Sequence, residues 1–437
     1  MTGTRLANRY ALLTGMRWFP VGLVFPVIVL IKEARGLDLT TIGQLMALYS
    51  IVTVALELPT GGLADVIGRR GVVILASLTS AVSMVVLALA TTVPVMATAV
   101  VLQGVGRALS SGPLTAWYVD TVHHRDVNGD INVGLSRGEA AEAWGLGIGG
   151  VLGGVLPVAA AAVWADLPSR GDAHVITLSV PLLLAAVLSV LHALAAALMV
   201  HELPRERQTL RAVTREVPRT VVDGLRLGTR DAVLRRLMLR MMLMGVTVGA
   251  VELLTPLRLA ELTGSVDGGS AWFGVLGALG FMGTGVGAIL APRAARSAGS
   301  GVRVVVVAAF ACAPLAALLA VPVLGVVAAA YVLMYALMGL AGPLIAAILH
   351  GRVGAQVRST VLSVESLALQ AGAMLASLGV SAFAQAAGLA WGYAVVAIAL
   401  ALTGLLMIGV PPAERADRSA DEDVRDGQRG VGRQVEV

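Results

Sequence analysis

Several ionisable side chains lie within long apolar stretches, where a charge is costly unless it faces protein or a water-filled cavity. Six of them are candidates for function: Arg17, Glu57, Arg107, Glu142, Glu252 and Glu365. A carboxylate in such a place is suited to binding and releasing a proton near neutral pH. We therefore expect these residues to serve proton coupling or to line a substrate cavity, with Glu57 and Glu252 as leading proton carriers and Glu365 third. A structural ion pair with Arg17 or Arg107 is the alternative for each acid.

Patterns typical of enzymes and metal sites do not emerge from the sequence. Its single cysteine, Cys312, excludes a disulfide within the chain and a cysteine cluster. Gly145, Gly147 and Gly150 match G-x-G-x-x-G, but a dinucleotide site needs this run between a strand and a helix of a soluble unit. Here the run lies inside an apolar stretch. We therefore predict no catalytic residue, no cofactor and no metal.

Long apolar segments must position the ionisable residues. Of the 437 residues, 57% are hydrophobic and 14% are charged, whereas soluble domains have about 45–50% apolar and about 25% charged residues. Windows of about 20 apolar residues predict membrane-spanning helices. The twelve predicted spans are 10–31, 41–63, 72–92, 95–119, 138–163, 175–200, 237–259, 270–291, 302–322, 325–348, 358–385 and 389–411.

A basic hydrophilic stretch divides these spans into two groups of six. We expect an N-terminal six-helix bundle over 1–200, a cytoplasmic linker over 201–236, a C-terminal bundle over 237–411 and a disordered tail over 412–437. Arginines gather in alternate loops, which places both termini and the linker in the cytoplasm by the positive-inside rule. Because these arginines are scattered over short loops, nucleic acid is not an expected partner.

A short hydrophilic run separates the second and third spans. From Gly61 to Arg70 it resembles G-x-L-A-D-x-x-G-R-R, the signature between helices 2 and 3 of the major facilitator superfamily of secondary transporters. The resemblance implies an all-α membrane protein with twelve helices in two pseudo-symmetric bundles around a central cavity. A weaker echo of the signature, without the acid, covers 287–296.

The same resemblance implies a charge lock that holds the cytoplasmic side closed. Its residues are Gly61, Asp65, Gly68, Arg69, Arg70 and, just past span 4, Asp120. In the superfamily the two acids and the arginines form one chain of charges. The alternative is that they are surface charges that only set the orientation in the membrane.

Span 5 is rich in glycine and resembles the antiporter motif G-x-x-x-G-P-x-x-G-G, with glycine at the proline position. Its glycines are Gly145, Gly149, Gly150, Gly153 and Gly154. Gly145, Gly149 and Gly153 recur every four residues, which predicts a smooth face packed against a helix of the other half. A generic packing face of small residues is the alternative. Importers generally lack this motif, so it favours export.

The resemblance therefore implies a transporter of the drug:proton antiporter type in a bacterial inner membrane. We expect a monomer that exports a small amphipathic or hydrophobic compound, such as an antibiotic, in exchange for protons. The alternatives are a proton-coupled importer, a metabolite exporter without a resistance role, and a lipid scramblase or flippase. The antiporter arginine of span 4 is Val100 here, and Arg107, two turns later, replaces it or serves another purpose. Trp18 and Trp144 lie deep enough in their spans to line the cavity.

Overall fold

The computed structural model describes residues 3–126, 129–164, 175–202, 231–350, 352 and 358–411. Within these ranges every regular element is helical. Eleven helical stretches are long and apolar enough to cross a membrane. The first helix is outside this count; it carries Arg5, Arg9 and Arg17. The chain is an all-helical, multi-pass membrane protein, as predicted.

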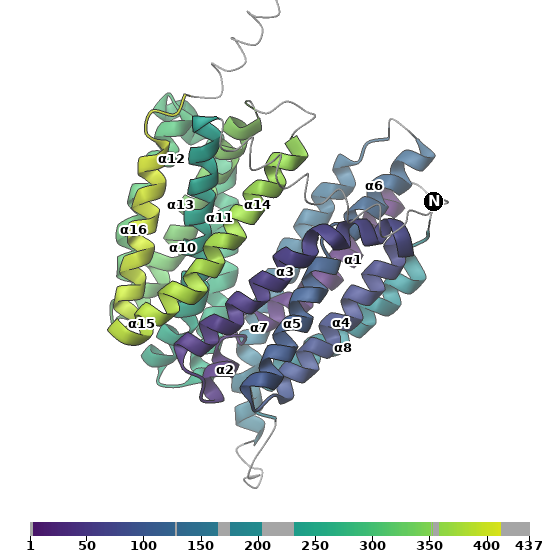
Figure 1. The fold of residues 1–437 in the computed structure, drawn as a ribbon, viewed down its shortest axis with the longest axis horizontal. Helices are drawn as coiled ribbons and strands as arrows, with labels where there is room; N and C mark the ends of the chain where they lie inside the picture. Colours follow the sequence, from purple (N-terminus) through teal and green to yellow (C-terminus); the bar gives the residue numbers. More distant parts are fainter. Residues whose placement is uncertain are drawn as a thin grey trace, which may run out of the picture.

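The first bundle contains the helices up to residue 199 (Figure 1). They are α1 (Gly3–Val24), α2 (Leu30–Ala34), α3 (Leu39–Ile67), α4 (Arg69–Leu89), α5 (Val93–Leu109), α6 (Pro113–Arg125), α7 (Asn132–Trp164) and α8 (Ser179–Met199). The second bundle begins after the predicted linker, most of which lies outside the described residues. Its helices are α10 (Ala232–Thr263), α11 (Val266–Ala298), α12 (Gly301–Leu318), α13 (Leu324–His350), α14 (Arg358–Leu375), the π-helix η1 (Ala376–Val380), α15 (Ser381–Ala387) and α16 (Leu389–Met407).

Two predicted spans are interrupted, and a third contains a π-helical segment. Span 1 breaks between α1 and α2 at a turn that contains Pro26, and span 4 breaks at Ser110–Gly112, where Gly112 has a φ of 90° and Pro113 begins α6. Proline lacks the amide hydrogen that a continuing helix needs, but it fits the first turn of a new one. Span 11 continues through η1 into α15. In contrast, α3 runs unbroken from Leu39 to Ile67, past Pro59.

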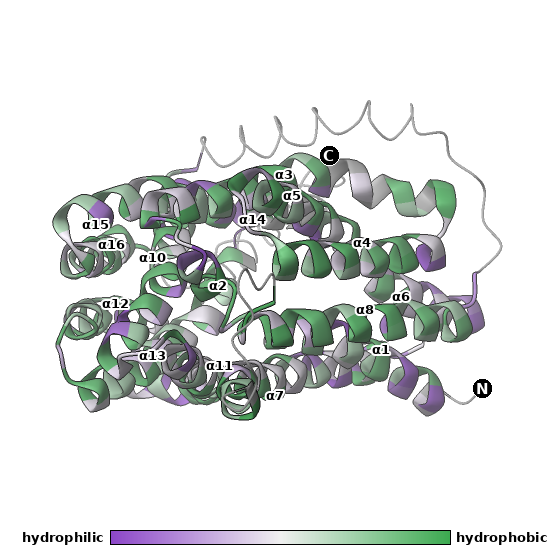
Figure 2. Ribbon diagram, turned by 90° about the horizontal axis from the view of Figure 1, so that it is seen from below, coloured by the Kyte–Doolittle hydropathy of each residue, from purple (hydrophilic) through white to green (hydrophobic). Residues whose placement is uncertain are grey.

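Hydrophobic residues extend along the helices, and hydrophilic residues gather towards helix ends such as the start of α1 (Figure 2). We call the face on which α1 begins and α16 ends the terminal face; it is at the top of Figure 1. The two bundles diverge towards this face and meet near the opposite one (Figure 1).

Three hydrogen bonds join the bundles near the face opposite the termini. The Leu39 amide donates to Gln385 Oε1 at 2.9 Å. The Thr177 hydroxyl donates to Asp267 Oδ1 at 2.7 Å. Ser270 Oγ donates to the Gly154 carbonyl at 3.1 Å. The bundles are therefore joined at this face, while their helices diverge towards the terminal face (Figure 1).

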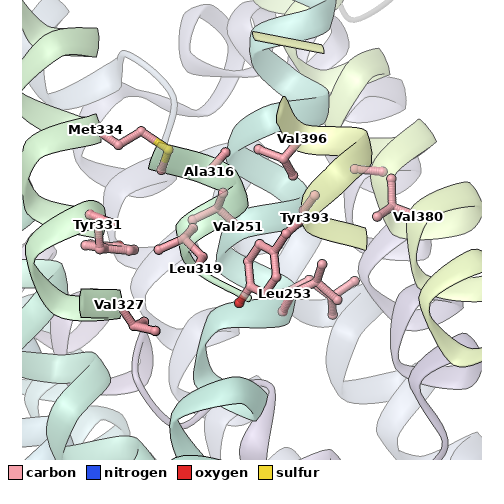
Figure 3. Packing of buried hydrophobic residues seen from close by; sticks show 14 of the residues in the cluster. Val251, Leu253, Ala316, Leu319, Val327, Tyr331, Met334, Val380, Tyr393 and Val396 are labelled. Carbon is pink, nitrogen blue, oxygen red and sulfur yellow. The ribbon is translucent and has the colours of Figure 1, made fainter. Parts of the chain in front are cut away.

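The largest buried cluster reinforces this closure. Its main part lies in the second bundle and includes Val251, Tyr331 and Tyr393 (Figure 3). Leu39 and Ile42 of α3 belong to the same cluster, so the first bundle contributes to the core of the second. Burial of apolar side chains thus adds to the hydrogen bonds between the bundles.

Candidate functional site

A cavity of about 480 Å³ lies against the first bundle. Its walls come from α1, α2, α3, α4, α5, α6 and α8, and one residue, Glu252 of α10, comes from the second bundle. Most of the lining is apolar. The charged and imidazole side chains in it are Arg17, Lys32, Arg107, His192 and Glu252.

Two predicted residues, Arg17 and Arg107, share the ring of Trp18. The guanidinium carbon of Arg17 lies 4.6 Å from the ring centroid, and that of Arg107 lies 5.9 Å from it. Both distances are within the range of cation–π attraction. Arg17 Nη2 also donates to Ser110 Oγ at 2.7 Å, which ties it to the break between α5 and α6. Glu142 does not line the cavity but is near enough to interact electrostatically with both arginines.

The remaining predicted acids lie elsewhere. Glu57 is outside the lining and accepts a hydrogen bond from Ser111 Oγ at 3.3 Å, rather than pairing with Arg17 or Arg107 as the alternative interpretation expected. Glu365 is also outside the lining and interacts electrostatically with the buried Arg240 of α10. Of the four acids, the structure thus places only Glu252 in the cavity wall.

Two cavity residues were missed by the sequence analysis. Lys32 is 1% exposed, and its Nζ contacts Met46 Sδ at 3.7 Å. It is the only lysine of the chain, which was a signal, but its position at the end of span 1 indicated a surface loop. His192 of α8 shares a hydrogen bond of 2.9 Å through Nδ1 with Ser77 Oγ. Its buried Nε2 has no hydrogen-bond partner among the described residues.

The two tryptophans that could have lined the cavity lie in different places. Trp18 does line it. Trp144 is 70% exposed and lies at an apolar groove on the outside of α1, α7 and α8. Met16 lines both the cavity and this groove.

The signature run ends in a turn of one residue. Gly61 to Ile67 continue α3, and Gly68, with a φ of 101°, leads directly into α4. Only glycine adopts this conformation without strain. The weaker echo of the signature does not contain a turn between two helices. Residues 287–296 lie inside α11, which continues to Ala298 and ends at Gly299.

Charges of the signature form contacts at the terminal face. Arg69 Nη2 lies 3.2 Å from Asp120 Oδ2, and the two side chains are 27% and 47% exposed. The amide of Arg70 donates to Glu202 Oε1 at 2.7 Å, so an acid outside the motif sits at the positive end of α4. The predicted positions Gly61 and Asp65 fall where the structure describes only the backbone.

The glycines of span 5 pack on two different helices. A Cβ at Gly145 would lie 3.1 Å from the Gly15 carbonyl oxygen, and one at Gly149 would lie 2.5 Å from that of Phe19. Gly153 is pressed in the same way against Leu23. All three partners belong to α1, so the prediction that this face meets the other half is wrong.

Gly150 and Gly154 make the contact with the second bundle. A Cβ at Gly154 would lie 2.5 Å from the Ser270 carbonyl oxygen, and Gly274 approaches the Gly150 carbonyl. An α-helix has 3.6 residues per turn, so this second face is turned by about 100° from the face that packs on α1. The helix α7 therefore has two glycine faces, one that packs on α1 within the first bundle and one that packs on α11 of the second bundle.

The described residues contain no group of His, Cys, Asp and Glu that could hold a metal ion. The arrangement instead offers a buried, mostly apolar compartment with a few charges. Such a compartment is suited to binding a small organic molecule.

Comparison with known proteins agrees with this architecture. No curated protein sequence matches the chain. Among solved structures, the nucleoside transporter NupG has a TM-score of 0.72 at 13% identity, with 94% of this chain and 100% of that chain covered. A D-xylose–proton symporter has a TM-score of 0.68 at 14% identity, with 93% and 98% covered. A bacterial homolog of the human lysosomal transporter Spinster, inward-facing and unoccupied, has a TM-score of 0.65 at 14% identity, with 96% and 98% covered.

The TM-scores indicate a shared fold, but the sequence identities are too low to show more than that. The family assignment therefore rests on the sequence itself. The sequence profile of the Major Facilitator Superfamily matches residues 10–364. The match spans most of the chain and includes the signature run, the glycines of α7 and all cavity-lining residues. The chain therefore belongs to the Major Facilitator Superfamily, whose members are membrane transporters.

Proposed function

We propose that the protein is a proton-coupled secondary transporter that exports a small amphipathic or hydrophobic compound by alternating access. The observation that carries this proposal is the position of Glu252. It is the one carboxylate in the cavity wall among the described residues, and it is contributed by the second bundle to a cavity otherwise lined by the first. Movement of one bundle against the other would change its surroundings, which is what proton coupling requires.

Further features support this function. The apolar lining suits an amphipathic substrate, and one protein of the same fold is a D-xylose–proton symporter. Arginines such as Arg69, Arg70 and Arg303 lie on the terminal face, so the positive-inside rule favours the cytoplasm of a bacterium on that side. The described arrangement would then be open to the cytoplasm.

The glycine motif favours export, and with it an antiporter of drugs or antibiotics that acts as a monomer. Gly150 and Gly154 lie at the contact between the bundles, where a motif that controls their movement would act. A role in multidrug efflux and antibiotic resistance follows if the exported compound is a drug.

Import together with protons is the second candidate, favoured by the cations of the cavity. An anionic substrate bound near Arg17, Lys32 and Arg107 would favour the protonated form of Glu252, because two negative charges in one cavity repel each other. Substrate and proton would then bind together and travel in the same direction. A cationic substrate would instead compete with the proton and be exchanged for it.

The substrate can be found by profiling drug susceptibility in a strain that expresses the chain. Transport of the compound found is then measured in proteoliposomes with an imposed pH gradient. We expect accumulation to require the gradient and to be abolished by a protonophore. Its direction relative to the gradient distinguishes exchange from cotransport.

A substitution then tests the role of Glu252. Glu252→Gln should abolish gradient-driven accumulation and leave the exchange of labelled for unlabelled substrate intact. Glu261→Gln is the matched control, since Glu261 lies on the same helix and is exposed beside Arg258. The proposal would be refuted if a protonophore left substrate accumulation unchanged, or if the Glu252→Gln variant still accumulated substrate in response to the pH gradient.

A further inference from the structure

The cavity contains more cations than anions. Arg17, Lys32 and Arg107 line it, and Glu252 is the only carboxylate among the described lining residues. Lys32 is almost fully buried, and its ammonium group contacts a thioether rather than an acid. The guanidinium of Arg107 makes no hydrogen bond or salt bridge with a described residue and lies over the ring of Trp18. Among the described lining residues the cations thus outnumber the one carboxylate, and Glu142, which lies outside the lining, offsets part of the charge of Arg17 and Arg107 but is not placed to offset that of Lys32.

Such an imbalance is costly inside a membrane protein. A buried cation without an anionic partner loses its hydration and gains little in return. The cost is offset when a bound anion supplies the missing charge. A cavity of this kind is therefore complementary to an anionic ligand, and a single carboxylate opposite three cations would make it a poor site for a cationic one.

We propose that the cavity binds an organic anion, and that Arg107, together with Arg17 and Trp18, holds its charged group. The group is a carboxylate or an oxyanion of similar charge and shape. This inference rests on the proposed function only in taking the cavity as the substrate site. It narrows the substrate class from amphipathic compounds in general to those that carry a negative charge. By the charge argument given for Glu252, such a substrate favours the second candidate, cotransport with protons.

The two arginines are placed for different tasks. Arg17 is anchored by its hydrogen bond to Ser110, so its position is fixed within the first bundle. Arg107 has its donors available, and a guanidinium can bind a carboxylate through two parallel hydrogen bonds. The Trp18 ring contacts both cations and holds them close together in spite of their like charge.

The rest of the wall suits the apolar body of such a ligand. Val24, Phe25, Ile28, Met46 and Met84 line the same cavity. A volume of about 480 Å³ is within the range of small-molecule sites. Methionine side chains adapt to ligands of varied shape, so the charged group would provide most of the selectivity.

Three probes with one apolar body and different charges test the proposal. They are naphthalene-2-carboxylate, its neutral carboxamide and naphthalen-2-ylmethylammonium. Their binding to the full-length chain in detergent is measured by titration calorimetry at neutral pH. We expect the carboxylate to bind at least about tenfold more tightly than the amide, and the ammonium to bind most weakly.

Variants assign the preference to the arginine site. Arg107→Gln should weaken carboxylate binding by about tenfold to a hundredfold and leave amide binding unchanged. Arg303→Gln, an exposed arginine at the start of α12, should change neither. If Arg107→Gln does not fold, Arg107→Lys keeps the charge but loses the two-pronged contact, and it should weaken carboxylate binding by a smaller factor.

Equal affinity for the three probes, or tighter binding of the ammonium, would overturn the proposal. So would a carboxylate affinity that no substitution of Arg107 changes. Because binding is measured without a gradient, a failure of proton coupling would leave these results intact. Conversely, a proton-coupled transporter that shows no preference for the carboxylate would contradict only the anion site.

Discussion

A methyl group added at Gly154 should weaken the contact between the two bundles. Its Cβ would lie 2.5 Å from the Ser270 carbonyl oxygen and 3.2 Å from Gly274 Cα, so α7 must move away from α11. The movement would also stretch the 3.1 Å hydrogen bond from Ser270 Oγ to the Gly154 carbonyl. Overpacking of this kind costs about 1–3 kcal/mol. We expect a shift of about 5- to 150-fold in the equilibrium, away from the arrangement that is open at the terminal face.

Pulsed electron paramagnetic resonance can measure this shift. Spin labels at His124→Cys and Arg296→Cys would report the separation of the bundles, since both residues are exposed near the terminal-face ends of α6 and α11. The buried Cys312 is replaced by Ser in this background. Gly154→Ala should raise the fraction of short distances.

Gly150→Ala is the matched control, because a Cβ there would meet its nearest atom at 3.6 Å, an ordinary contact. A Cβ at Gly147 would meet nothing within 4 Å, so Gly147→Ala controls for helix propensity alone. Identical distance distributions for Gly150→Ala and Gly154→Ala would refute the reasoning. So would a Gly154→Ala distribution equal to that of the labelled chain with glycine at position 154.

Three further predictions concern stability and rate. Gly149→Ala should lower thermal stability by about 1–3 kcal/mol without changing the distance distribution, because its contact lies within one bundle. Asp120→Asn should change stability by less than about 1 kcal/mol, since the ion pair with Arg69 is partly exposed, but it should slow the initial rate of transport. Hydrogen bonds from Thr41 lower the pKa of Asp38, so the ionised Asp38 side chain stabilises the start of α3. This stabilisation is complete above the pKa that Asp38 has in the unfolded chain, and it is lost as the pH falls through the lower pKa of the folded chain. Thermal unfolding at decreasing pH should show this loss in the unsubstituted chain and not in Asp38→Asn.

The helix pattern could be predicted from the sequence because its signals are local. A membrane-spanning helix needs about 20 apolar residues, and charges such as Arg69 and Arg70 must stay outside the bilayer. The break at Ser110–Gly112 left no trace in hydropathy, because serine and glycine are mild enough to continue an apolar window. Gly112 and Pro113 together were the available signal.

The site was harder to predict because it depends on the packing of several helices. Glu57 and Glu252 have the same sequence signal, an acid in an apolar span, yet only Glu252 lines the cavity. The burial of Lys32 depends on the turn between α1 and α2. The regular spacing of Gly145, Gly149 and Gly153 predicted a packing face but could not identify α1 as its partner.

Because residues of both bundles line the cavity, a substitution between the bundles and a substitution at the arginine site should change ligand affinity in different ways. Arg17, Arg107 and Trp18 belong to one bundle and should move together, because Arg17 is hydrogen-bonded to Ser110 at the end of α5 and both arginines lie over the Trp18 ring. Their preference for a negative charge should therefore not depend on how the bundles are placed. Gly154→Ala should then change the affinities for naphthalene-2-carboxylate and its amide by the same factor, whereas Arg107→Gln should change only the first. A Gly154→Ala variant that loses the preference for the carboxylate in calorimetry would show that the anion site needs both bundles.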